Sequence, residues 1–255
     1  MKVVILAGGL GSRLREETEI KPKPMVELAG LPILWHIMNG YSVYNHKEFV
    51  ICGGYKNEVI KSWFANLRLF KSDIRINFGA SQNIEYMDSA HENEWDVVVS
   101  NTGAETQTGG RLFRVKKYLE NETFMCTYGD GLASVNIDEL LKFHKSHGKI
   151  ATLTSVMPPT RFGVIDVSSD GLIRSFKEKP QTDSWVNAGF FVFEPEIFDY
   201  LDAESILERE PLEKLAAEGQ LMAFRHDGFW QPMDTYRDKL ELESLWNSGN
   251  PPWTT

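Results

Sequence analysis

The chain has 255 residues, of which 42% are hydrophobic, 12% aromatic and 25% charged; this is the composition of a folded globular protein and excludes a disordered one. Its length fits one embellished α/β domain better than a multi-domain assembly. The 36 acidic against 27 basic residues give a net charge of -9, which opposes attraction to polyanions and argues against a nucleic-acid partner.

Expected strands and helices alternate along the first part of the chain. Strands are predicted at 2–6, 48–52, 74–78, 97–99 and 124–127, and helices at 32–44, 56–65, 111–118 and 136–147. A strand, a helix and a further strand in succession imply right-handed parallel crossovers. The expected fold class is therefore α/β, with a doubly wound, mostly parallel, Rossmann-like sheet.

Closely spaced strands follow in the C-terminal half, predicted at 151–156, 162–167, 171–176 and 189–193. They are expected to add antiparallel strands to the sheet or to form a cap beside it. Two further helices are predicted, at 211–218 and 235–246. The polar, unpatterned stretch 79–94 is either a long loop or an excursion toward a partner subunit.

The cysteines, the histidines and the lengths of the apolar runs indicate where the protein is located and which metal sites it lacks. Cys52 and Cys126 each lie in an apolar run, which predicts buried, reduced thiols. The six histidines lack the spacing of a zinc site, and we expect them at the surface. No apolar run approaches the roughly 20 residues that span a bilayer, and no cleavable signal opens the sequence. We therefore expect a cytoplasmic protein without a membrane partner.

The loop after the first expected strand, Leu6-Ala7-Gly8-Gly9-Leu10-Gly11-Ser12-Arg13, is the first candidate site, because open α/β sheets bind ligands at the carboxyl ends of their strands. Its glycines let backbone N–H groups approach a phosphate, while Ser12 supplies a hydroxyl and Arg13 a forked cation. It matches neither the P-loop nor the dinucleotide fingerprint, which needs a glycine at Leu14. A glycine turn without a ligand is the alternative.

Two further features place charged side chains near such a loop. In Lys21-Pro22-Lys23-Pro24 the prolines hold the backbone extended, so the two lysines point in different directions and one of them can enter a cleft. Asp130 lies between two glycines after the strand at 124–127, which presents a carboxylate at the carboxyl end of that strand. The alternatives are a basic surface turn and an ordinary turn residue.

Seven short motifs occur in a fixed order over nearly the whole chain: LAGGLGSRL, KPMVELAGLPILWHI, TGGR, YGDG, EKP, VNAGFF and FWQPMDT. Together they resemble the sugar-nucleotide pyrophosphorylases, and within these the branch that uses CTP and glucose 1-phosphate. Members of the family transfer a nucleoside monophosphate from an NTP to a sugar 1-phosphate and release pyrophosphate. The resemblance implies one nucleotidyltransferase domain over 1–255, with 1–130 mainly nucleotide-binding, 131–235 mainly sugar-phosphate-binding, and 236–255 forming a C-terminal helix and tail.

The same resemblance implies four sets of site residues. The expected catalytic cations are Arg13, Lys23 and Lys179. The expected nucleotide-binding residues are Leu6, Ala7, Gly8, Gly9, Leu10, Gly11, Ser12, Arg13, Lys23, Thr106, Thr108, Gly109, Gly110, Arg111 and Gly129. The expected sugar-phosphate-binding residues are Glu178, Lys179, Asn187 and Gly189. Asp130 and Asp234 are the expected ligands of Mg²⁺, an ion that prefers oxygen ligands.

The expected chemistry follows from charge. A sugar phosphate has a second pKa of about 6, so it is mostly a dianion at neutral pH and needs no general base. Cationic side chains and Mg²⁺ would reduce its repulsion from the triphosphate and permit in-line attack on the α-phosphorus, without a covalent enzyme intermediate.

Other interpretations stay open. They are another NTP such as dTTP or UTP, another sugar 1-phosphate, or a sugar-nucleotide sensor that keeps the fold without catalysis. A nicotinamide oxidoreductase is disfavoured by Leu14. The resemblance also implies a homo-oligomer, specifically a hexamer, and a product used in CDP-linked deoxysugars of surface polysaccharide such as O-antigen.

Overall fold

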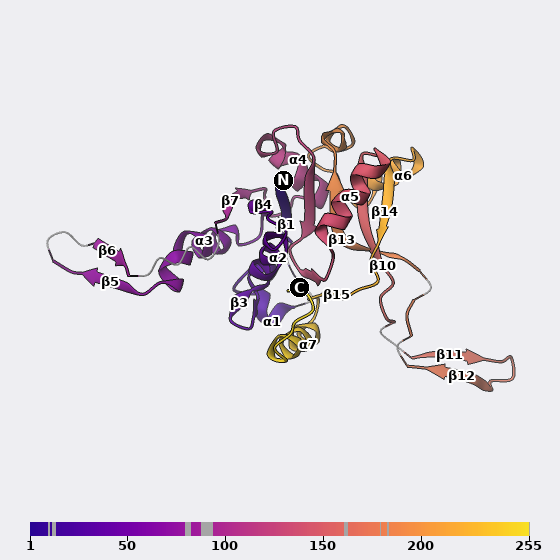
Figure 1. The fold of residues 1–255 in the computed structure, drawn as a ribbon. Helices are drawn as coiled ribbons and strands as arrows, with labels where there is room; N and C mark the ends of the chain where they lie inside the picture. Colours follow the sequence, from indigo (N-terminus) through magenta and orange to yellow (C-terminus); the bar gives the residue numbers. More distant parts are fainter. Residues whose placement is uncertain are drawn as a thin grey trace.

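A computed structural model describes residues 1–9, 11, 14–79, 83–87, 94–160, 163–178, 180–182 and 184–254. A central sheet carries helices on both faces, and two hairpins project from opposite sides of this body (Figure 1). In spatial order the strands of the sheet are β14 (Leu221–Arg225), β10 (Ala151–Val156), β13 (Val186–Phe193), β8 (Phe124–Tyr128), β1 (Val3–Ala7), β4 (Glu48–Gly53) and β7 (Asp96–Asn101).

The sheet is parallel except at one strand. β1 pairs in parallel with both β4 and β8, and β4 pairs in parallel with β7. β13 runs antiparallel to both of its neighbours, β8 and β10, while β14 pairs in parallel with β10. The expected α/β class, with a mostly parallel sheet and an antiparallel strand in the C-terminal half, is confirmed.

Helices close the crossovers and cover the sheet. They are α1 (Arg15–Thr18), α2 (Ile33–Ser42), α3 (Asn57–Lys71), α4 (Thr108–Val115), α5 (Ile137–His147), α6 (Glu210–Ala217) and α7 (Tyr236–Asn247), with 3₁₀ turns η1 (Lys23–Met25), η2 (Lys116–Tyr118) and η3 (Pro195–Tyr200). None of these helices, in the parts of the chain that the structure describes, is long and apolar enough to cross a membrane.

Two apolar cores lie on the two faces of the sheet. Because side chains alternate along a strand, Val3 and Ile5 of β1 enter one core with α2 and α5, while Val4 and Leu6 enter the other with α4, η3 and α6. All five residues of β1 are buried, as expected for a central parallel strand covered on both faces. The centre of the sheet therefore holds the carboxyl end of β1 rigidly in place.

Both cysteines are buried and free, as predicted. Burial raises the pKa of the Cys52 thiol to about 12 and raises that of Cys126 well above its usual value. The expectation of surface histidines is wrong for His36 and His144, which are 2% and 1% exposed. These rings have polar partners inside: His36 Nε2 lies 2.9 Å from the Leu28 carbonyl, and His144 bonds to side chains of Thr152 and Glu194.

In the described ranges, four small two-stranded sheets lie outside the main one. They are β2 (Glu27–Leu28) with β3 (Leu31–Pro32), β5 (Ile74–Asn77) with β6 (Asn83–Tyr86), β9 (Gly131–Ala133) with β15 (Trp230–Pro232), and β11 (Val164–Val167) with β12 (Ile173–Lys177). The strand expected at 74–78 does not join the main sheet: it forms a projecting hairpin with β6, inside the stretch 79–94 expected to lack a pattern (Figure 1).

Candidate active site

A cavity of about 380 Å³ opens at the carboxyl ends of β1 and β8. Most of the expected nucleotide and metal residues line it, and they come from segments far apart in the sequence. The predicted residues that it brings together are Leu6, Ala7, Gly8, Gly9, Gly11, Lys23, Thr106, Thr108, Arg111, Gly129, Asp130 and Asp234; Pro24, Gln107 and Tyr128 complete the lining. The expected residues Leu10, Ser12, Arg13 and Lys179 lie outside the described residues.

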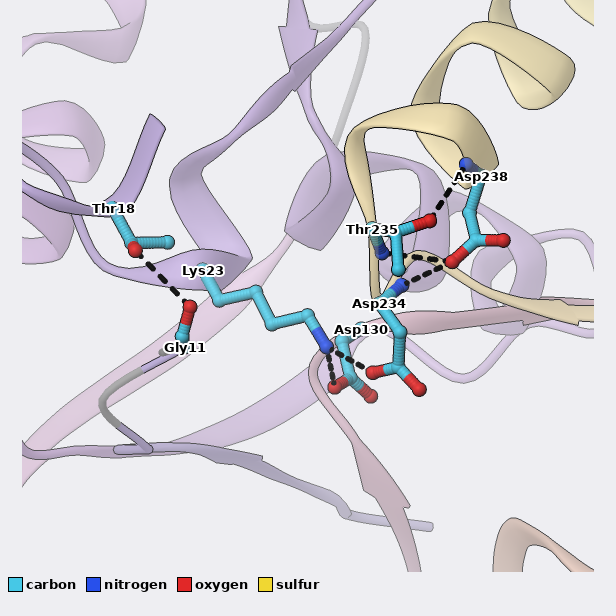
Figure 2. A network of polar contacts seen from close by, with 7 residues as sticks. All are labelled: Gly11, Thr18, Lys23, Asp130, Asp234, Thr235 and Asp238. Atoms are coloured by element: carbon cyan, nitrogen blue, oxygen red, sulfur yellow. Dashed lines mark hydrogen bonds and ion pairs between the residues drawn. The ribbon is translucent and has the colours of Figure 1, made fainter. Parts of the chain in front are cut away.

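Lys23 bridges the two expected metal ligands. Its Nζ lies 2.6 Å from Asp130 Oδ2 and 2.7 Å from Asp234 Oδ1, so both carboxylates contact one ammonium group (Figure 2). Lys21 points elsewhere, toward Glu17 and Glu27 at 3.6 and 3.3 Å. The two lysines of the Lys-Pro-Lys-Pro run therefore diverge as their spacing predicts, and Lys23 is the one that enters the cavity.

The charge state of Lys23 follows from two opposing effects. Burial alone would lower the pKa of its ammonium group, but attraction to Asp130 and hydrogen bonds to both carboxylates outweigh that cost, so the pKa is raised. Lys23 therefore keeps its positive charge at neutral pH. Its ammonium group holds one oxygen of Asp130 and one of Asp234 close to the same nitrogen atom.

Backbone and capping bonds fix the two carboxylates. The Met233 N–H donates to the Asp130 carbonyl at 2.8 Å, next to the short β9–β15 pairing. Asp238, in the first turn of α7, accepts from the backbone N–H groups of Asp234 at 3.1 Å and Thr235 at 2.7 Å (Figure 2). Thr235 and Asp238 form a capping box. Asp238 was not among the expected site residues, although the spacing Thr-x-x-Asp at the start of an expected helix indicates a capping box.

Arg111, in the lining of the cavity, donates hydrogen bonds to three loops. It is 4% exposed, and burial lowers the pKa of its guanidinium, which stays charged. Its two Nη atoms donate to Gly8 O at 2.9 Å, Ala104 O at 3.1 Å, Gly103 O at 2.7 Å, Thr102 Oγ1 at 2.8 Å and Gly53 O at 3.4 Å. The residues that carry these oxygens lie at the end of β4 or directly after β1 and β7. A Cβ at Gly8 would overlap the guanidinium, so Arg111 is one reason for glycine there.

Gly109 and Gly110 begin α4 against another segment of the same chain. A Cβ on Gly109 would lie 2.8 Å from Ser205, and one on Gly110 would overlap the carbonyl oxygen of Ala203. Close packing within the chain therefore accounts for both glycines. Their contact with a nucleotide stays a prediction.

Two of the expected sugar residues, Asn187 and Gly189, contact Tyr128 of the cavity lining but are not part of the lining themselves. Asn187 Nδ2 donates to the hydroxyl of Tyr128 at 3.2 Å, and Tyr128 does line the cavity. Gly189 has a φ of +83°, and a Cβ there would overlap the Tyr128 ring. Glu178 is exposed just after β12, outside the lining. Tyr128 belongs to the YGDG motif but was not among the expected site residues.

The donor set of the cavity suits a hard, oxygen-liganded cation. Within the described ranges no group of three or more His, Cys, Asp or Glu side chains could hold a metal ion. Asp130 and Asp234 nevertheless converge on one point, and Mg²⁺ usually takes one or two protein carboxylates together with water and substrate phosphates. These two residues would hold it.

Comparisons with known proteins identify the family of the chain. A sequence model described as "Nucleotidyl transferase" matches residues 2–236. The chain is 52% identical over its whole length to "Glucose-1-phosphate cytidylyltransferase" of Salmonella typhi, covering 99% of that protein. It is 40% identical to "Probable glucose-1-phosphate cytidylyltransferase" of Bacillus subtilis, over 99% of each chain.

Solved structures share the fold. HddC from Yersinia pseudotuberculosis has a TM-score of 0.68 at 23% identity, over 96% of this chain and 99% of its own. Apo UDP-glucose pyrophosphorylase has a TM-score of 0.69 at 14% identity, over 98% of both chains. With the family match over nearly the whole length and the full-length relatives, the conclusion is that the chain belongs to the nucleotidyl transferase family.

Proposed function

We propose that the protein transfers cytidine monophosphate from CTP to glucose 1-phosphate, producing CDP-glucose and pyrophosphate. The observation that carries the proposal is the convergence of Lys23, Asp130 and Asp234 on one cavity at the carboxyl ends of β1 and β8. The choice of CTP and glucose 1-phosphate rests on the full-length likeness to the Salmonella typhi protein.

Electrostatics and positioning would carry the chemistry. The sugar phosphate arrives mostly as a dianion, because its second pKa is about 6, so it can attack without a general base. Lys23, held as a cation, would meet the triphosphate and reduce the repulsion between two anionic reactants. Arg13 and Lys179 are the further cations that we assign to the phosphates. A single in-line displacement at the α-phosphorus predicts inversion of configuration there.

The remaining assignments divide the site in two. We place the nucleotide on the loop from Leu6 to Arg13 and on the start of α4, and the sugar phosphate near Glu178, Asn187 and Gly189. Asp130 and Asp234 would hold Mg²⁺. When bound, this ion supplies positive charge to the phosphate oxygens of the nucleotide.

The test is pyrophosphate release from glucose 1-phosphate with CTP, dTTP or UTP, each with and without Mg²⁺. We expect a strong preference for CTP and a requirement for Mg²⁺. Asp130→Asn and Asp234→Asn should lower turnover severely without unfolding the protein, because each removes one oxygen ligand from a polar cavity. Equal rates with the three nucleotides would reject the substrate assignment, and nucleotide binding without release would favour a sensor.

We further propose that the protein is a homo-oligomer, specifically a hexamer, built through its projecting hairpins. The β11–β12 hairpin exposes apolar side chains that include Ile165, Leu172 and Phe176, which are 48%, 65% and 63% exposed. Ile76, Ile84 and neighbouring apolar residues are likewise exposed on the β5–β6 hairpin. Large apolar side chains exposed together on a hairpin are typical of contacts with another chain.

A further inference from the structure

The segment from Asp202 to Glu208, between η3 and α6, lies directly against the first turn of α4. The Gly110 N–H donates to the Ser205 carbonyl at 2.9 Å, and the Leu207 N–H donates to Thr108 Oγ1 at 3.0 Å. The close approach at Gly109 and Gly110 belongs to the same contact. The start of α4, which we assign to the nucleotide, is thus packed against this segment.

The segment is held in one shape by its own polar groups. Asp202 Oδ1 accepts from the Glu204 N–H at 2.9 Å and from Ser205 Oγ at 2.8 Å, and Ser205 Oγ in turn accepts from the Asp202 N–H at 2.9 Å. These bonds within four residues form a local turn. This turn and the bond from the Leu207 N–H to Thr108 Oγ1 hold the segment that leads into Glu208.

Glu208 accepts hydrogen bonds from two residues of the cavity lining. Tyr128 Oη donates to Glu208 Oε1 at 2.6 Å, and Thr108 Oγ1 donates to Glu208 Oε2 at 2.6 Å. Bonds to an ionised carboxylate are among the strong ones. Tyr128 ends β8 and Thr108 begins α4, so one side chain links two walls of the cavity.

The direction of each bond in this network is determined. The Gly189 N–H donates to Asn187 Oδ1 at 2.8 Å, which turns Asn187 Nδ2 toward the Tyr128 hydroxyl as a donor. Tyr128 must then give its own proton to Glu208. Thr108 Oγ1 accepts from Leu207, so its proton also goes to Glu208. Both carboxylate oxygens of Glu208 therefore act as acceptors.

We propose that Glu208 is a positioning residue that holds the sugar side of the site in register with the nucleotide side. Asn187 and Gly189 connect to it through Tyr128, and the start of α4 connects to it through Thr108. The assignment rests on the proposed function, because it concerns how two substrates meet. Its consequence is specific: loss of the link disturbs the alignment of the two reactants more than the binding of either one.

Glu208→Gln is the sharpest test, because it keeps the size and shape of the side chain. A glutamine amide has only one acceptor atom to face the two hydroxyl protons, so one of them loses its partner. We expect kcat to fall about tenfold to a hundredfold, since small misplacements of reacting groups have effects of that order. KM for CTP and for glucose 1-phosphate should each change less than about threefold.

The controls separate positioning from folding. Glu204→Gln alters an exposed carboxylate in the same segment and should behave as wild type. Because Glu208 is also exposed, the melting temperature of Glu208→Gln should match that of Glu204→Gln. The double variant Tyr128→Phe/Thr108→Val should reproduce the loss of kcat, and Glu208→Gln added to it should have little further effect.

Unchanged kcat in Glu208→Gln would overturn the proposal, as would a fall in kcat that is matched by a fall in melting temperature. A readout independent of turnover is the NMR resonance of the Asn187 side-chain amide, which should shift in Glu208→Gln and stay in place in Glu204→Gln. If the wild type released no pyrophosphate, the proposed function would fail. The amide resonance would then decide the positioning role by itself.

Discussion

Lys23 is the residue on which the electrostatics of the cavity depend, because its single charge faces two carboxylates. Lys23→Met removes the ammonium group that contacts both Asp130 and Asp234, which increases the repulsion between the two carboxylates. These side chains are 31% and 22% exposed, so solvent screens part of the repulsion. We expect a loss of about 1–2 kcal/mol of stability. Added Mg²⁺ should raise the melting temperature of the variant more than that of the wild type, as thermal unfolding with and without the ion would show.

Lys21→Met is the matched control for that measurement. Lys21 is two residues away and pairs with Glu17 and Glu27. Neither of these two residues is an expected metal ligand. Its variant should respond to Mg²⁺ as the wild type does. If Mg²⁺ raised the melting temperatures of Lys23→Met and the wild type equally, Lys23 and the ion would not compete for the carboxylates of Asp130 and Asp234.

The resemblance to the sugar-nucleotide pyrophosphorylases predicted which side chains meet in the cavity, but not which contacts hold them there. The proline spacing predicts that Lys23 and Lys21 diverge, because proline restricts the backbone locally. The role of Arg111 has no such local signal. Its acceptors follow or end three different strands, and only the folded sheet brings those carbonyls around one guanidinium. The glycine at position 8 likewise reflects a side chain that lies 103 residues later in the chain.

At the scale of elements, the start of α7 positions Asp234. Asp238→Ala removes the acceptor for the backbone N–H groups of Asp234 and Thr235. Loss of a cap of this kind costs about 1 kcal/mol, or roughly 3 °C in melting temperature for a chain of this size. We expect turnover to fall at least tenfold, a larger effect than the change in stability suggests, because a proposed metal ligand becomes mobile.

Arg237→Ala, on the same turn of α7, provides the comparison. Arg237 is 73% exposed and pairs with Glu241 on its own helix, so its variant should keep wild-type turnover. Steady-state rates at saturating Mg²⁺, measured beside thermal unfolding, distinguish the two variants. Equal turnover in both would show that the capping box does no more than stabilise the helix.

Elements differ in how far local pattern determines them. The strand and helix alternation around β1, β4, β7 and β8 was predictable, because each crossover helix has its own apolar periodicity. The position of β5 outside the main sheet was not predictable, because a short apolar run fits both a strand of the sheet and a separate hairpin. β14 was missed although it extends the main sheet, because its five residues LMAFR are only half-buried or exposed and lack the strong apolar run of a central strand.

At the scale of the whole molecule, the projecting hairpins are difficult to explain for an isolated chain. A two-stranded hairpin is marginally stable by itself, and β11–β12 places Ile165 opposite Phe176 on one face with both side chains exposed. A second copy of the chain would cover that face. The expected mass in solution is six times the chain mass of 29.1 kDa.

Light scattering coupled to size exclusion tests this assembly directly. Ile165→Asp/Phe176→Asp places two charges on the apolar face of the hairpin, and we expect a smaller assembly with little change in the unfolding of the main sheet. Ser175→Lys adds a charge on the other face of the same hairpin, directly opposite Asp166, and should leave the mass unchanged. A wild-type protein that runs as a monomer at micromolar concentration would contradict the assembly. The exposed apolar face would then need a different partner.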